Sequence, residues 1–266
     1  MITGGQQSFI NHALPILKRD ERVVGVALGG SYIRRDRMDE FSGLTFIVAV
    51  DPAQYEAVLA ERTAIAARLG KLLAGFTGEH IQRPELLICL YDEPLLHVDL
   101  YFLPPDGAAE RYENPVVIFE RQGAITEALS SKPAERPEPD LQWYEDRFWI
   151  WVHYAATRIG RGELFDAISS LDFLRVNVLG PMLQIQHGKP PQGVRYIERD
   201  APEESLRLAE TLASYGKPDC VRALKAAVNL YISLRGMRVE GIALRDKAES
   251  RALAYLKYIA ERIEEN

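Results

Sequence analysis

Three small residues, Gly29, Gly30 and Ser31, stand where an apolar run from Val23 to Leu28 gives way to a polar stretch. Glycines let a backbone approach phosphate oxygens closely and adopt positive φ angles. A helix that began at Ser31 would direct its free N–H groups and its dipole at such an anion, and the Ser31 hydroxyl would add a contact. The triplet therefore predicts a phosphate-binding turn, with a plain strand-to-helix turn as the alternative.

Candidate metal ligands follow further along the chain. Residues 43 and 45 would share one face of the next strand, where Gly43 has no side chain and Thr45 has a neutral hydroxyl, a poor anchor for Mg²⁺. Asp99 lies in the middle of the apolar run 95–103, as a metal ligand or as a satisfied polar group on a half-solvated strand. His97 would share a face with Asp99 and is a further candidate ligand.

The polar loop 34–40 also carries acids. Asp36, Asp39 and Glu40 are candidates to replace the missing ligands, by reaching a metal through water. The alternative is a solvated loop whose acids pair with the arginines of the same stretch.

Apolar spacing predicts the elements that position these residues. In the first half we expect strands at 23–28, 44–50, 85–91, 95–103 and 116–119, and helices at 6–19 and 52–73. The proline-rich stretch SSKPAERPEPD predicts a linker over 130–140. Beyond it we expect helices at 141–157, 164–183, 202–213, 219–234 and 244–263. These patterns predict an α/β (α+β) domain over 1–135 with a mixed sheet, followed by a helical bundle domain over 136–266.

Bulk composition limits the choice of partners. The chain has 32 basic and 38 acidic residues, a net charge of −6, which disfavours nucleic acid and is compatible with a small cationic ligand. No apolar run reaches the roughly 20 residues of a membrane helix, and we find no signal peptide. Cys89 and Cys220 lie far apart and read as buried thiols of a reducing compartment. We therefore expect a cytoplasmic protein with a small-molecule ligand; its oligomeric state is left open.

The stretch from Gly30-Ser31 to Gly43-Leu44-Thr45 resembles the DNA-polymerase-β-like nucleotidyltransferase superfamily, in which Gly-Ser is followed on the next strand by Asp-x-Asp. In that resemblance Gly43 and Thr45 occupy the positions of two metal-binding aspartates, and Asp99 matches the third carboxylate. The resemblance implies a nucleotidyltransferase fold with Mg²⁺ and ATP or another NTP as cofactors, or no cofactor if the incomplete ligand set has lost them.

The helical half carries a second resemblance. Residues 148–175, FWIWVHYAATRIGRGELFDAISSLDFLR, are similar to the helical domain of aminoglycoside adenylyltransferases, especially the streptomycin 6-adenylyltransferase type. There an aspartate on the second helix acts as the base that deprotonates the acceptor hydroxyl, and Asp172 falls at the matching place. A buried carboxyl would suit that role. The alternative for Asp172 is a local ion pair with Arg175 at i+3.

Three functional hypotheses follow. The first is a catalytically degenerate nucleotidyltransferase-like protein that binds a nucleotide or other small molecule in a cleft between the domains. The second is an active Mg²⁺-dependent enzyme that moves AMP onto a hydroxyl of an aminoglycoside-like acceptor. The third is a non-catalytic interaction module. Asp99 and Asp172 are the catalytic candidates, Asp99 is the metal candidate, and the ligand-binding candidates are Gly29, Gly30, Ser31 and Thr45. Whether the chain is an enzyme stays open at this stage.

Overall fold

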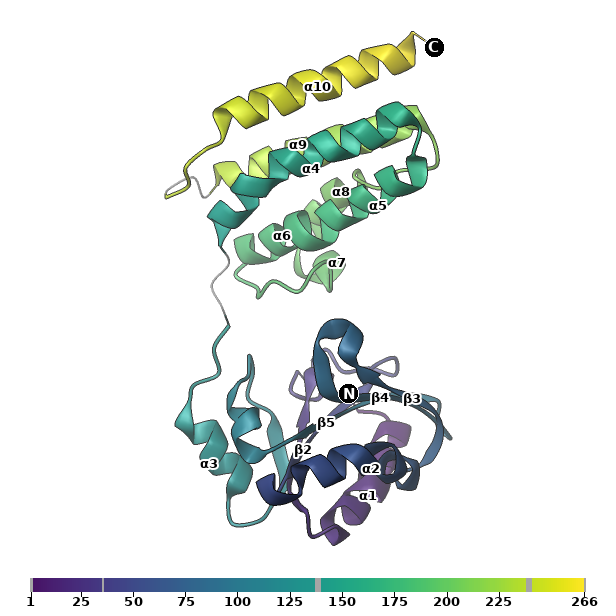
Figure 1. The fold of residues 1–266 in the computed structure, drawn as a ribbon, viewed down its shortest axis with the longest axis vertical. Helices are drawn as coiled ribbons and strands as arrows, with labels where there is room; N and C mark the ends of the chain where they lie inside the picture. Colours follow the sequence, from purple (N-terminus) through teal and green to yellow (C-terminus); the bar gives the residue numbers. More distant parts are fainter. Residues whose placement is uncertain (1, 35, 137–139, 238–240, 266) are drawn as a thin grey trace. The chain divides into compact units, whose positions relative to one another are not determined.

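The computed structural model describes residues 2–34, 36–136, 140–237 and 241–265. It divides into two compact units, Met1–Arg136 and Pro137–Asn266 (Figure 1). No helix among the described residues is long and apolar enough to cross a membrane. Cys89 and Cys220 are both free and buried, as the sequence predicted.

The first unit is built on a six-stranded sheet in the order β3-β4-β5-β2-β1-β6. Its strands are β1 Val23–Gly29, β2 Leu44–Val50, β3 Lys71–Gly78, β4 Arg83–Asp92, β5 Leu96–Leu103 and β6 Val116–Glu120. Strands β2 and β5 pair in parallel, and the other neighbouring pairs are antiparallel. The predicted mixed sheet is therefore confirmed.

Helices cover this sheet unequally. The helices of the unit are α1 Gly4–Arg19, α2 Tyr55–Arg68 and α3 Ala124–Ser131. Helices α1 and α2 pack on one face, where Phe9 and Ile65 join Phe46 of β2 in a single core. Helix α3 covers part of the opposite face, where Ile125 packs against Ala27 and Ala49. On β3 and β4 the second face is exposed only in part: Leu73 and Leu90 are exposed, whereas Leu86 is buried.

The helix expected at 52–73 is wrong at its C-terminal end. Helix α2 stops at Arg68, and β3 begins at Lys71. Gly70 makes the turn between them, where a Cβ would lie 3.2 Å from the ring of Phe9 and 3.1 Å from that of Tyr91. Strand β3 is an edge strand with mostly exposed side chains, so it lacks the alternation that marks a half-buried strand. Helix α3 was also not predicted.

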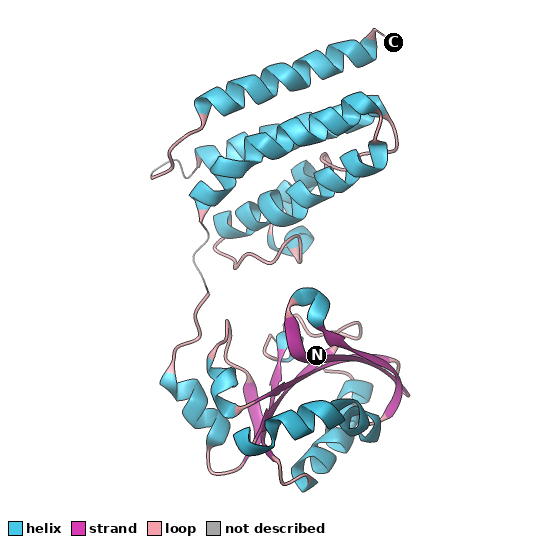
Figure 2. Ribbon diagram, viewed as in Figure 1, coloured by secondary structure: helices cyan, strands magenta, loops and turns pink. Residues whose placement is uncertain are grey.

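The second unit is helical, as predicted (Figure 2). Its α-helices are α4 Leu141–Arg161, α5 Leu164–Leu174, α6 Gly180–Gln186, α7 Ile197–Asp200, α8 Pro202–Ala209, α9 Lys217–Gly236 and α10 Asp246–Glu264. The single helix expected at 164–183 is interrupted, because a π-helical turn at Arg175–Leu179 separates α5 from α6. The carbonyl of Gly193 occupies the place of a Cβ on Gly180, so the glycine lets a later loop pack against this irregular turn.

A buried charge network joins three helices of the second unit. The Glu145 carboxylate on α4 accepts hydrogen bonds from Tyr231 Oη at 2.7 Å, Trp149 Nε1 at 3.1 Å and the Arg245 backbone N–H at 2.9 Å. Arg235 Nη1 lies 3.2 Å from the same carboxylate and 2.8 Å from Glu249 on α10. Burial alone would raise the pKa of Glu145, but these donors outweigh it and lower the pKa. The network therefore favours an ionised Glu145 and ties α4, α9 and the start of α10 together.

Candidate functional site

The glycine turn follows directly from β1. Gly30 has a φ of 58°, in the left-handed region that glycine adopts without strain. A Cβ at Gly30 would also lie 3.0 Å from Thr45 Oγ1, so both conformation and space call for glycine. At Gly29 the backbone is extended, and a Cβ would make ordinary contact with Thr45 at 3.7 Å. The two glycines thus have different structural requirements.

The helix N-terminus that would support a phosphate at Ser31 is not formed. Residues Gly30–Tyr32 form one turn of 3-10 helix instead. A single turn sums too few peptide dipoles to act as the N-terminus of a long helix. Among the described residues, neither the Ser31 hydroxyl nor the Thr45 hydroxyl has a hydrogen-bond partner, and both side chains are partly exposed. Any anion site at this turn must therefore use hydroxyls and local backbone rather than a helix dipole.

Strand register brings three of the sequence candidates into one row. Gly29 on β1 pairs with Thr45 on β2, and Thr45 pairs with Asp99 on β5. Neighbouring strands lie about 4.8 Å apart, and paired residues share a face of the sheet. The Thr45 and Asp99 side chains therefore lie next to each other on the face opposite α1 and α2, beside the glycine turn. The candidates of the first unit thus converge, as a common site requires.

Asp99 is a half-exposed carboxylate with one internal partner. Its side chain is 29% exposed, and its Oδ1 lies 2.9 Å from Nε2 of His97, whose side chain is 59% exposed. In the tautomer with hydrogen on Nε2, the imidazole donates to the carboxylate. Tyr101, two residues further along the same face, has a pKa raised by burial and additionally by the negative charge of Asp99. Asp99 thus has the geometry of a satisfied polar group, with a second oxygen still available to a ligand.

The row does not fit a Mg²⁺ ion. Mg²⁺ in proteins is held by carboxylate oxygens, and Asp99 is the carboxylate in the row. Gly43 has no side chain that could bind a metal. A Cβ added at this position would lie 2.8 Å from the backbone oxygen of His97. Thr45 supplies a neutral hydroxyl. Across the part of the chain that the structure describes, no group of three or more His, Cys, Asp or Glu side chains could hold a metal ion.

Two of the three loop acids, Asp36 and Asp39, are engaged locally. Asp39 Oδ1 accepts hydrogen bonds from the Phe41 N–H at 3.0 Å and from Ser42 Oγ at 2.8 Å. Asp36 lies 4.0 Å from Arg37, which agrees with the solvated-loop interpretation for that pair. Arg34 pairs with Glu113, outside its own loop. A role for Asp36, Asp39 or Glu40 as substitute metal ligands stays a prediction.

Asp172 belongs to α5 in the second unit. Its side chain is 64% exposed and ion-paired with Arg175 Nη2 at 3.0 Å, so it is not the buried carboxyl that would suit a base. Arg175 is itself anchored by donating to the Thr211 carbonyl at 2.8 Å. The interpretation of Asp172 as one half of a local ion pair is confirmed. The exposed Asp172 side chain lacks the desolvation that a buried catalytic carboxyl would have. The base role of Asp172 and the cleft between the units stay predictions.

The sequence did not reveal the contact that leaves no space for a side chain at position 43. The parallel register places Gly43 beside His97, and the approach of the two backbones leaves no space for a side chain. The signal in the sequence was a glycine directly before a β-branched strand, which is typical of close backbone approach. The partner in that approach could not be read from local sequence.

Comparisons with known proteins found similar solved structures but no matching family model. No family model matches the chain. No curated protein matches it. Among solved structures it is similar to an aminoglycoside 6-adenyltransferase from Bacillus subtilis, with 17% identity and a TM-score of 0.42 over 97% of this chain and 99% of that one. It is also similar to a nucleotidyltransferase-like protein from Exiguobacterium sibiricum 255-15, with 15% identity and a TM-score of 0.37 over 85% of this chain and 74% of that one.

Proposed function

We propose that this chain is a nucleotidyltransferase-like protein that binds a nucleotide or another phosphorylated small molecule at the Gly29–Ser31 turn and does not carry out metal-dependent transfer. The observation that carries the proposal is the row Gly29–Thr45–Asp99, which places the glycine turn beside one carboxylate and two hydroxyls, those of Ser31 and Thr45, that have no hydrogen-bond partner among the described residues. Glycine backbone and hydroxyls suit phosphate oxygens.

The missing ligands explain why we assign binding rather than transfer. Metal ions clamp the attacking and leaving oxygens in nucleotidyl transfer. If that clamp contributes about 4 kcal/mol to the transition state, its loss slows the reaction roughly 10³-fold. Gly43 and Thr45 supply no carboxylate, and Asp99 by itself leaves most of an octahedral shell to water.

Calorimetric titration with ATP, AMP and inorganic phosphate, each in Mg²⁺ and in EDTA, tests the proposal. We expect binding of at least one phosphorylated ligand in both media and no pyrophosphate release. Gly30→Ala should remove that binding, because its methyl group strains the turn and presses on the Thr45 hydroxyl. Gly4→Ala, on α1 at the opposite face of the sheet, is the control, because a Cβ there meets nothing within 4 Å, and it should bind like the native chain.

Three outcomes would contradict the proposal. Absence of heat and of any thermal shift with all three ligands would favour an interaction module. Binding that requires Mg²⁺ together with pyrophosphate release would show an active transferase. Binding that is equally strong in Gly30→Ala would place the ligand elsewhere.

A further inference from the structure

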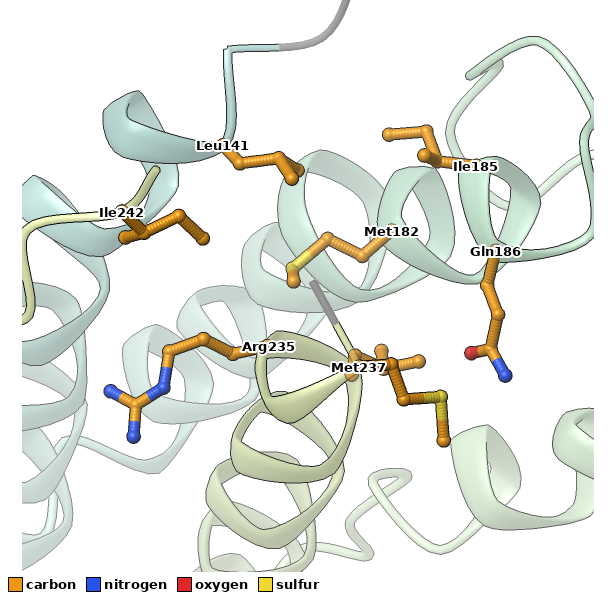
Figure 3. A pocket seen from close by; sticks show the side chains of 8 residues that line it. Leu141, Met182, Ile185, Gln186, Arg235, Met237 and Ile242 are labelled. Atoms are coloured by element: carbon orange, nitrogen blue, oxygen red, sulfur yellow. The ribbon is translucent and has the colours of Figure 1, made fainter. Parts of the chain in front are cut away.

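A small pocket in the second unit lies among the start of α4, helix α6, the end of α9 and the segment before α10 (Figure 3). Met182, Leu234 and Met237 are among its lining side chains. Its space holds about one water molecule, so the pocket is too small for a metabolite. The first unit offers a stronger candidate for contact with a ligand, the surface residue Phe41.

Phe41 is displayed to solvent in the loop that leads into β2. It is 88% exposed, more than any other large apolar residue among those that the structure describes. The same loop buries Met38, which is 3% exposed and joins the core of the first unit. The loop therefore packs one apolar side chain into the core and holds another away from it. Single exposed apolar residues are common, so the meaning of this display depends on how the turn around Phe41 is held.

Hydrogen bonds fix the turn 39–42 on both sides of Phe41. The Asp39 carboxylate accepts from the Phe41 N–H at 3.0 Å and from Ser42 Oγ at 2.8 Å, and Ser42 Oγ accepts from the Asp39 N–H at 3.1 Å. Gln6 of α1 is 2% exposed, and its Nε2 donates to the Asp39 carbonyl at 2.8 Å and to the Ser42 carbonyl at 2.7 Å. A buried amide donor is costly to leave unpaired, so these two bonds attach the turn to α1. Phe41 is thus preorganised, which lowers the entropic cost of a contact with a ligand.

The braced turn 39–42 lies at the same end of the sheet as the glycine turn. Strands β1 and β2 are antiparallel, and Gly29 at the end of β1 pairs with Thr45 near the start of β2. Phe41 comes two residues before Gly43, so the Cα atoms of these two residues lie within about 7 Å of each other. A ligand whose phosphate lies at the glycine turn therefore has an exposed aromatic ring close to the rest of its body.

We propose that Phe41 is a specificity-determining residue of the phosphate site and packs against a planar ring of the bound ligand. This role rests on the proposed function, because it requires a phosphate group at the Gly29–Ser31 turn. An aromatic side chain stacks on planar heterocycles of any kind, since each has a π-face. A ligand made only of a sugar and a phosphate would leave Phe41 in water and gain nothing from it. The site therefore selects phosphorylated molecules that carry a ring.

AMP and ribose 5-phosphate form a matched pair of probes, because they share a phosphorylated ribose and differ by the ring. Ligand-observed NMR titration of the full chain in EDTA should show AMP binding about 5- to 100-fold more tightly, the range that stacking on one aromatic residue gives. In Phe41→Ala the two affinities should agree within about 2-fold, while the affinity for ribose 5-phosphate stays native. Phe41→Tyr keeps a ring and should retain the preference. Phe165→Ala, at a residue 80% exposed on α5 of the second unit, is the control and should also retain it.

Ser42→Ala tests the bracing of the turn while leaving the Phe41 ring in place. The substitution removes the hydroxyl that bonds to the Asp39 N–H and carboxylate. The preference for AMP should fall by about 2- to 10-fold, because ordering a loosened turn costs part of the contact. An unchanged preference in Ser42→Ala would contradict the role given to the turn. Thermal unfolding of each variant verifies that it is folded before titration.

Four results would overturn the role of Phe41. Equal affinities of the native chain for AMP and ribose 5-phosphate would do so and leave the proposed function standing. Absence of binding by both probes, and by ATP and inorganic phosphate, would refute the proposed function and this role with it. A preference for AMP that survives in Phe41→Ala would place the ring elsewhere. A native chain that sediments as a dimer, with Phe41→Ala as a monomer, would make Phe41 a contact between copies of the chain instead.

Discussion

Replacing Thr45 with aspartate tests the central row of the site most directly. Because Thr45 and Asp99 pair in parallel register, the substitution places two carboxylates on neighbouring strands of one face. At about 5 Å, and with the dielectric near that of water that suits a partly exposed pair, their repulsion is about 1 kcal/mol. In a chain of this size such a loss lowers the Tm by roughly 2–4 °C.

Divalent metal should reverse this loss. Two facing carboxylates offer Mg²⁺ or Mn²⁺ the oxygen ligands that the native row lacks. At a metal concentration 100 times its Kd, binding contributes about 2.7 kcal/mol to the stability of the folded state. That gain exceeds the repulsion, so Thr45→Asp with saturating metal should melt a few degrees above its own metal-free form and above the native chain. At 1 M salt the repulsion should shrink, since the Debye length falls to about 3 Å.

Differential scanning calorimetry with EDTA or MnCl₂ measures both effects. Thr45→Asn is the matched control, because it is similar in size and neutral, and it should respond to neither salt nor metal. If Thr45→Asp unfolds like Thr45→Asn with and without metal, the two side chains do not share a face and the proposed row is wrong. Gly43→Asp is a poorer probe, because its Cβ would meet the His97 carbonyl oxygen at 2.8 Å and destabilise the strand whatever its charge.

Three further perturbations give predictions of definite sign. Gly30→Ala should lose about 1–2 kcal/mol of unfolding free energy in urea, because it forces a side chain into the left-handed region, whereas Gly29→Ala should stay close to native. Asp99→Asn should tighten the binding of a phosphorylated ligand in EDTA by removing a like charge, and weaker binding would instead indicate a metal-dependent site. Because the pKa of Glu145 is lowered in the folded chain, its contribution is present above the ordinary value of 4.5 and is lost as pH falls through the folded pKa. Glu145→Gln should therefore cost about 3–5 kcal/mol at pH 7, the usual penalty for breaking a buried pair, and flatten the acid limb of the unfolding curve.

The sequence predicted those elements of the fold in which apolar residues recur at a regular spacing. Strand β2 alternates over Leu44–Ile47 between buried and partly exposed side chains, and its bounds agree with the prediction at Leu44–Val50. Strand β3 was hidden because an edge strand with exposed side chains has no apolar alternation. Exposure of Asp172 could not be predicted, since the helix containing it looked apolar nearly all round while the packing of α5 leaves one side open.

The sequence indicated which residues are candidates for the site, but it could not show which of them lie side by side. Register, which depends on pairing between distant segments, decides that Asp99 stands beside Thr45. In sequence, Gly43 looks like a lost aspartate that one substitution could restore. In the structure its place is limited by the His97 backbone, so an acid at 43 would also require β5 to move. Thr45 has no such restriction. The two positions therefore differ in kind: an acid at 45 would replace an existing side chain, whereas an acid at 43 would need space that the neighbouring strand occupies. A chain that had merely lost its metal ligands would accept both acids equally, so unequal tolerance of Thr45→Asp and Gly43→Asp would show that this strand end has been reshaped for a site without metal.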